Sequence, residues 1–235
     1  MKILSWSLVL AVSFIAFFPK AILAEEITID QLLANVENAV SGIDDISYRM
    51  AMSDPLSKDS TIFYWYKRPY LQKQYSILKG HKGFLGFILH DHDTERITIL
   101  KKEGDQVVCF YRIDGEKEIK KKIWGAAESF GNLDSYGKYF IKYIKNIKKE
   151  YPYTITKQEN PEGIIYKLVS QTGPIGNEPG SYETELDFRV SDWLPIKEII
   201  KCDGHIVFIH DYQDIVVNHG ISDDVFQIDV PEAKK

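Results

Sequence analysis

The chain has 235 residues, of which 27% are charged and 44% hydrophobic, and its formal net charge is −5. This length suits one domain with a substantial core, or two small ones. Nucleic-acid-binding proteins need a basic face toward the phosphates, so the acidic excess argues against that class and we expect no nucleic-acid partner.

Residues 1–24 have the pattern of a secretory signal peptide. Lys2 gives a basic start, residues 3–18 are almost purely apolar, and Ala24 precedes the acidic pair Glu25–Glu26. The apolar run is shorter than the roughly 20 residues that span a bilayer, although an uncleaved anchor is the alternative. We expect cleavage after Ala24 and a single domain over residues 25–235. That chain has 27 basic and 34 acidic residues, since Lys2 and Lys20 are removed, and a net charge of −7.

An amphipathic helix is predicted over residues 29–41, with Thr28 or Asp30 as its cap and Gly42 at its end. Short alternating segments then follow, separated by turn-forming residues, and they predict strands. These strands cover residues 46–52, 61–67, 70–78, 97–100 and 106–113.

Helical spacing of apolar residues returns at residues 133–149, with lysines between them. Strands are predicted again at 151–157, 163–170, 182–190, 194–202 and 205–217. Asp203–Gly204 is a two-residue hairpin turn between the last two. The order favours an antiparallel sheet or barrel with one inserted helix rather than alternating βαβ units.

The two cysteines, Cys109 and Cys202, leave two alternatives open. In an exported protein they can form one disulfide that closes a long loop, or they can be two buried free thiols. Their spacing fits no zinc site.

Aromatic residues are abundant, and residues 63–66 place four in a row. Alternate residues of a strand point to opposite sides, so Phe63 and Trp65 lie on one face and Tyr64 and Tyr66 on the other. One interpretation is an ordinary sandwich core with exposed tyrosines. The other is a curved sheet whose apolar concave face is closed by helices and holds acyl chains.

Motifs that carry chemistry are missing from the sequence. His90–Asp91–His92–Asp93 offers two alternate histidines for a metal ion, but it lacks a third ligand and a solvated turn is the simpler interpretation. The sequence has no Gly-x-Ser-x-Gly elbow, phosphate loop or dinucleotide fingerprint. We therefore expect no enzyme activity, no metal and no cofactor.

Three segments resemble the LolA family of periplasmic lipoprotein carriers. The first is the aromatic strand at residues 62–66 followed by Lys67–Arg68–Pro69–Tyr70–Leu71. The others are Trp193–Leu194–Pro195–Ile196–Lys197 and the C-terminal block at residues 211–226 with Val230–Pro231 after it. The order of signal peptide, helix, strands, inserted helix and strands also agrees.

This resemblance implies an α+β fold, an open antiparallel half-barrel with helices covering its concave face. It implies a periplasmic carrier that takes lipid or lipoprotein acyl chains from an inner-membrane exporter to an outer-membrane acceptor. Arg68 matches the family arginine that hydrogen-bonds to lid-helix backbone in the closed state and releases when ligand enters. A planar guanidinium suits that role, because it can hold several carbonyls at once.

Six residues are candidates for the ligand-binding wall, because they share apolar strand faces: Phe63, Trp65, Tyr75, Ile77, Ile97 and Ile99. A one-residue slip in register reverses each assignment. We expect a monomer. Two other functions stay open, an envelope sensor or scaffold that recognises lipoproteins or membrane proteins without transporting them, and a hydrolase whose site the sequence does not reveal.

Overall fold

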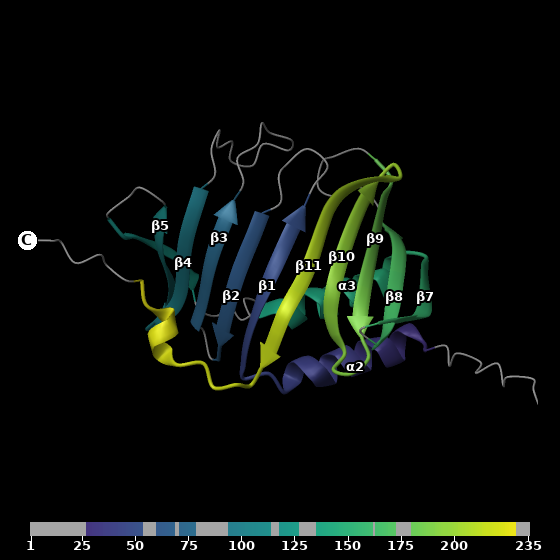
Figure 1. Ribbon diagram of the computed structural model, residues 1–235, viewed down its shortest axis with the longest axis horizontal. Coiled ribbons are helices and arrows are strands. Elements are labelled where there is room, and N and C mark those ends of the chain that lie inside the picture. Colours follow the sequence, from purple (N-terminus) through teal and green to yellow (C-terminus); the bar gives the residue numbers. More distant parts are fainter. Residues whose placement is uncertain are drawn as a thin grey trace, which may run out of the picture.

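One large antiparallel sheet dominates the computed structural model (Figure 1). The structure describes residues 27–53, 60–68, 71–78, 94–113, 118–126, 135–161, 163–172 and 180–228. Its eleven strands lie in the order β6-β5-β4-β3-β2-β1-β11-β10-β9-β8-β7. The sheet is open, because β6 and β7 end this order without pairing in the described part of the chain.

The strands follow the chain in two runs of neighbours. The first run is β1 (Asp45–Ser53), β2 (Ser60–Lys67), β3 (Leu71–Leu78), β4 (Thr94–Glu103), β5 (Gln106–Ile113) and β6 (Lys120–Ala126). The second is β7 (Tyr153–Asn160), β8 (Gly163–Thr172), β9 (Tyr182–Arg189), β10 (Leu194–Cys202) and β11 (His205–Val217). The pairing of β1 with β11 joins the two runs, so the register at this seam decides which residues of one run share a face with those of the other.

Two α-helices lie on one side of the sheet, α2 (Ile29–Ser41) and α3 (Ser135–Glu150) (Figure 1). A capping box starts α2: the Thr28 hydroxyl accepts from the Gln31 amide at 3.2 Å, and the Gln31 side chain accepts from the Thr28 amide at 2.8 Å. The helices also touch each other. A Cβ added to Gly137 on α3 would lie 2.1 Å from Val40 on α2, so the glycine permits a close crossing.

The sheet face that contacts α2 and α3 is here called the inner face, and the opposite one the outer face. The helices bury an apolar stripe between themselves and the inner face of β1, β2 and β8–β11. The buried members of this core are Ile29, Leu32, Val36, Val40, Ile43, Ile46, Tyr64, Tyr66, Phe140, Ile144, Ile147, Leu168, Leu186, Phe188, Leu194 and Tyr212. In this half of the molecule the space between helices and sheet is packed with side chains.

The last described residues of the chain lie on the outer face of the sheet. Residues 221–228, the C-terminal strap, contain the short 3₁₀ helix η2 (Asp223–Phe226). Lys67 donates to the Ile221 carbonyl at 2.9 Å, and Lys73 donates to the carbonyls of Val225 and Gln227 at 2.8 and 3.1 Å. Ile221 and Phe226 are buried, so the strap is fixed by apolar contacts as well as by two lysines.

Most sequence predictions of elements are confirmed. The helix at 29–41 has the predicted bounds, and the inserted helix covers residues 135–150. The hairpin at Asp203–Gly204 has positive φ at both residues, 48° and 80°, as the predicted turn requires. The sequence analysis predicted neither β6 nor η2.

The two cysteines do not pair. Cys109 lies buried on β5 and Cys202 lies half-buried on β10, and both are free thiols. Burial raises the pKa of Cys109, and the charges of Arg96 and Lys122 offset part of that rise. The predicted signal peptide and the segment His90–Asp93 lie outside the described residues.

Candidate functional site

The six predicted wall residues lie on the same face of the sheet. Phe63 on β2 pairs with Tyr75 on β3, and Tyr75 pairs with Ile97 on β4. Direct partners in an antiparallel sheet point to the same side. The pairings of Thr61 with Ile77 and of Lys73 with Ile99 add the other candidates, and Trp65 lies two residues from Phe63.

That shared face is the outer one. Tyr64 and Tyr66 alternate with the candidates along β2, and both belong to the core under the helices. Phe63, Trp65 and Tyr75 form a row of stacked rings, the outer aromatic row, with centroid distances of 6.3 and 6.0 Å from Phe63 to its two neighbours. The structure therefore brings the candidates together but separates them from α2 and α3, and a ligand-binding role for them stays a prediction.

Arg68 contacts the C-terminal end of α2, and its role as a gate stays a prediction. Its Nη2 donates to the Ser41 carbonyl in the last turn of α2 at 3.2 Å, and its backbone amide donates to the Asp44 carbonyl at 2.8 Å. Asn218 donates to the next carbonyl, that of Gly42, at 2.7 Å. A cation beside the last carbonyls of a helix is also favoured by the helix dipole. These contacts tie the C-terminal end of α2 to the sheet.

A second group of residues, which the sequence analysis did not select, lies on the inner face where β1, β11 and β10 meet. Met52 on β1 pairs with His210 on β11, and His210 pairs with Glu198 on β10. Phe208 and Ile200 pair with each other one step further along. Phe208, His210 and Tyr212 form a continuous row of rings along β11. Glu198 is the one acidic residue among these.

Glu198 is held by donors from two elements. Only 2% of the residue is exposed, and its Oε2 lies 2.8 Å from His210 Nδ1. Its Oε1 accepts the hydroxyl of Tyr139, on α3, at 3.1 Å. Burial and then the charge of Glu198 raise the pKa of both Tyr139 and Tyr212, so the two phenols stay protonated. The Tyr139 hydroxyl is thus a polar tether between α3 and the sheet.

Alternation along residues 205–217 could have revealed this group. Phe208, His210 and Tyr212 fall on one side, as do Met50 and Met52 in β1. A strand pattern shows that residues share a face, but it does not say which face the helices cover. That assignment follows from the β1–β11 seam, which joins the two ends of the chain.

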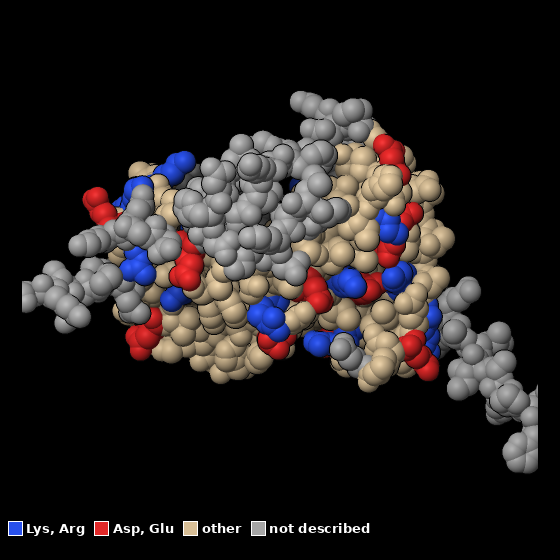
Figure 2. Space-filling model, turned by 45° about the horizontal axis from the view of Figure 1, so that its top comes forward, with Lys and Arg blue, Asp and Glu red and all other residues tan. Residues whose placement is uncertain are grey.

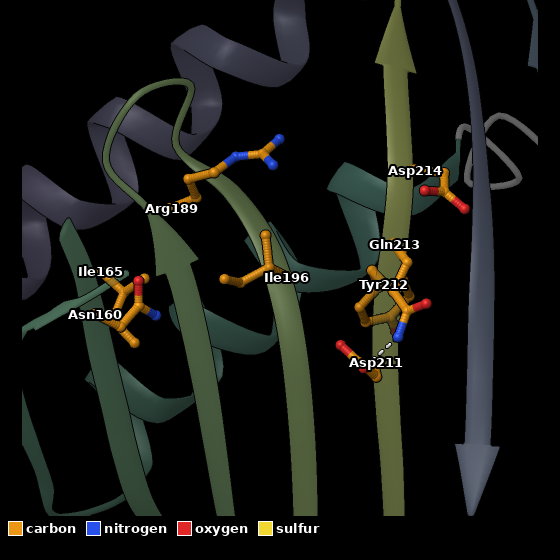
Figure 3. Close-up of a pocket in the computed structure, with 8 residues that line it drawn as sticks. All are labelled: Asn160, Ile165, Arg189, Ile196, Asp211, Tyr212, Gln213 and Asp214. Carbon is orange, nitrogen blue, oxygen red and sulfur yellow. Dashed lines mark hydrogen bonds between the residues drawn. The ribbon is translucent and has the colours of Figure 1, made fainter. Parts of the chain in front are cut away.

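A polar hollow of about 500 Å³ lies across β8–β11 (Figure 3). Its charged groups already have partners: Arg189 binds Asp192, Asp214 binds Arg49 at 2.9 Å, and Asp211 accepts from Gln213 at 2.6 Å. Such a lining does not suit an acyl chain. Figure 2 shows acidic and basic side chains side by side on the molecule, and residues of β8–β10 supply them through pairs such as Lys167 with Glu185.

Within the ranges that the structure describes, no group of three or more His, Cys, Asp or Glu side chains is arranged to hold a metal ion. In the same ranges no helix has the length and apolarity needed to cross a bilayer.

Comparisons of sequence give no match: no family model and no curated protein matches this chain. Comparisons of structure do. An uncharacterized conserved protein from Thermus thermophilus matches with a TM-score of 0.51 and 10% identity, over 87% of this chain and 94% of that one. This match shows that the fold occurs in a solved structure.

Two further matches have TM-scores below 0.5 and carry no argument by themselves. MucB of Pseudomonas aeruginosa, solved with MucA, has a TM-score of 0.43 and 12% identity over 86% of this chain, which spans 61% of the MucB chain. A Vibrio parahaemolyticus domain named for outer membrane lipoprotein sorting has a TM-score of 0.37 and 12% identity, over 85% of this chain and 97% of that one.

Proposed function

We propose that this protein is a carrier of LolA type, which holds the acyl chains of a lipid or lipoprotein on the inner face of its sheet and delivers them between membranes. In this proposal the inner face is the concave face of a half-barrel, and α2 and α3 are its movable cover. Binding and release need no catalysis. The signal peptide at residues 1–24 exports the chain, and residues 25–235 act as one monomeric domain in the periplasm.

The observation that carries this proposal is how the helices are attached. They pack on each other and are joined to the sheet by a few polar contacts, from Arg68 and Asn218 to α2 and from Tyr139 to Glu198. Between these points the contact is apolar. An acyl chain can therefore replace helix side chains without a change in the kind of contact, and each buried CH₂ contributes about 0.8 kcal/mol.

Arg68→Leu tests the proposal. Loss of the contact to the Ser41 carbonyl weakens the closed state, so the open, loaded state gains by the value of one hydrogen bond, about 0.5–1.5 kcal/mol. We expect release of a fluorescent fatty acid to slow by about two- to tenfold. The measurement is the dissociation rate after mixing with empty vesicles.

Arg49→Leu is the matched control. Arg49 lies on β1 and binds Asp214 on the outer face, away from the helices. Its loss should leave release unchanged. Failure of the unaltered protein to bind any acyl chain would remove the carrier proposal, whereas equal release from all three proteins would remove only the role of Arg68.

The sensor or scaffold alternative is favoured by one observation, the outer aromatic row. Phe63, Trp65 and Tyr75 lie on the face that α2 and α3 do not cover, and each is partly exposed. In this alternative the row binds an apolar segment of a lipoprotein or membrane protein. A Trp65→Ser variant that binds and releases acyl chains normally but loses a protein partner would favour it over the carrier.

A further inference from the structure

Glu198 is a buried acid on the face that we propose for acyl chains. Its cross-strand partners, Leu186 on β9 and His210 on β11, place its side chain on the inner face. Leu186 is fully buried in the helix-covered core. The carboxylate therefore lies at the border between that core and the partly exposed group formed by Met52, Phe208 and Ile200.

No lysine or arginine neutralises this acid among the described residues. Its ion-pair partner there is His210, whose side chain is 21% exposed, whereas the side chain of Glu198 is 3% exposed. Two acids of the neighbouring strand behave differently: on the outer face, Glu183 and Glu185 of β9 bind Lys201 of β10. A carboxylate buried without a permanent cation is costly, by several kcal/mol for an ion of this size.

One of its two donors lies on the movable element. Tyr139 is on α3, and 52% of the residue is exposed although its hydroxyl meets Glu198. If the cover moves for a ligand to enter, Glu198 Oε1 loses this donor while His210, on the sheet, remains. The vacated oxygen then lies beside an apolar surface and can accept a new donor, and a charged donor is the best one.

We propose that Glu198 selects amphiphiles whose headgroup carries a protonated amine. This inference rests on the proposed function and adds a ligand class to it. The ammonium group replaces the Tyr139 hydroxyl at Oε1 and places a permanent positive charge beside the carboxylate, while the acyl chain lies along Met52, Phe208 and Ile200. Glu198 is a specificity residue in this scheme and takes no part in any reaction.

The test compares two lysophospholipids with the same acyl chain. Lysophosphatidylethanolamine carries a primary ammonium, and lysophosphatidylglycerol carries hydroxyl groups in its place. We expect the unaltered protein to bind the first about tenfold more tightly, as one charge-assisted hydrogen bond permits. In Glu198→Gln the preference should fall to near one. Tyr139→Phe, which removes the competing hydroxyl, should increase the preference.

Asp214→Asn is the control for net charge. It removes one negative charge from the outer face, where the Asp214 side chain is 71% exposed, and should leave the preference at tenfold. Equal binding of both lipids by the unaltered protein, a result that needs no variant, would overturn the inference and leave the carrier function standing. A preference that survives in Glu198→Gln would overturn it too. If neither lipid binds, the proposed function itself fails.

Discussion

Strands β3 and β9 belong to the same sheet but have opposite polarity. On β9 the inner residues Thr184, Leu186 and Phe188 are fully buried, and the outer ones are Glu183, Glu185 and Asp187. On β3 the inner residues are Gln72, Gln74 and Ser76, and the outer ones include Tyr75 and Ile77. The apolar side of β9 is thus its inner side, whereas that of β3 is its outer side.

Each of these two strands therefore has its own cover. The helices α2 and α3 pack on the inner face around β9, whereas the C-terminal strap crosses the outer face at β2 and β3, held by Lys67 and Lys73. Charged ladders make the outer face of β9 soluble, while hydrogen bonds such as that from Gln74 to Ser76 satisfy the inner face of β3. The comparison teaches that one sheet can offer two apolar surfaces, one on each side.

Substitution of Phe188 by alanine tests the core that α2 and α3 cover. The residue is completely buried on the inner face of β9, and Phe→Ala substitutions at such sites cost about 3–5 kcal/mol. We expect Phe188→Ala to lower the free energy of unfolding by that amount in urea. Tyr75→Ala on the outer face of β3 is the comparison, and it should cost clearly less because Tyr75 is only half-buried. Equal losses would contradict the assignment of the main core to the inner face.

Gly137→Ala changes the contact between α2 and α3 and leaves the strands beneath them unaltered. Its new Cβ would come within 2.1–2.7 Å of three atoms of Val40, so the helices have to move apart. Overpacking of this kind costs about 1–3 kcal/mol. Urea unfolding measures the loss of stability, and the fluorescence of a dye that binds exposed apolar surface measures the separation of the helices. Both changes should appear together. Lys138→Ala, at an exposed neighbouring position, should show neither.

The sequence predicted the elements well but not the faces that they cover. The alternation of Phe63, Tyr64, Trp65 and Tyr66 showed correctly which residues share a side, and the pairing with Tyr75 and Ile97 followed. It could not show that these rings face away from the helices. That relation depends on β1 pairing with β11, a contact between residues about 160 positions apart such as Met50 and Tyr212, and no local pattern encodes it.

The group around Glu198 on the inner face could not be predicted from the sequence for a related reason. Glu198 lies in a strand whose other charged residues, Lys197 and Lys201, face the outer side. From the sequence alone, one glutamate among lysines on a strand is an ordinary surface residue. Its burial arises because β9, β11 and α3 meet over it, and each of these elements comes from a different part of the chain.

Phe226→Ala tests the smaller cover. Phe226 is a buried residue of the strap, but residues 222–224 of the strap are exposed and the strap is joined to the sheet by Lys67 and Lys73. A segment of this kind can open locally without unfolding of the sheet. We expect faster amide hydrogen exchange in residues 221–228 and a change in global stability below about 1 kcal/mol. Asp224→Ala, at an exposed strap position, should leave the exchange rates nearly unchanged, and slow exchange in both variants would contradict this view of the strap.

The smallest expected effect distinguishes two acids on the outer face of β9. Burial raises the pKa of Asp187 above its ordinary value of 3.8, although Lys167 and Lys197 act against the rise, and its Oδ1 has no hydrogen-bond partner among the described residues. Burial also acts to raise the pKa of Glu185, but hydrogen bonds from Lys201 and Lys167 outweigh it, so that this pKa is lowered from 4.5. Two acids two residues apart therefore have shifts of opposite sign.

These signs predict opposite dependences on pH. A raised pKa means that ionised Asp187 opposes folding at neutral pH, a penalty that is relieved as pH falls through the folded-state pKa, so Asp187→Asn should help stability more at pH 7 than near pH 3.5. A lowered pKa means that Glu185 stabilises the fold above about pH 4.5 and loses this effect in acid, so Glu185→Gln should harm stability more at pH 7. Each difference should stay within about 1 kcal/mol. Urea unfolding at the two pH values measures the stability change of each variant. If both variants showed the same sign of pH dependence, the opposite pKa shifts of Asp187 and Glu185 would be wrong.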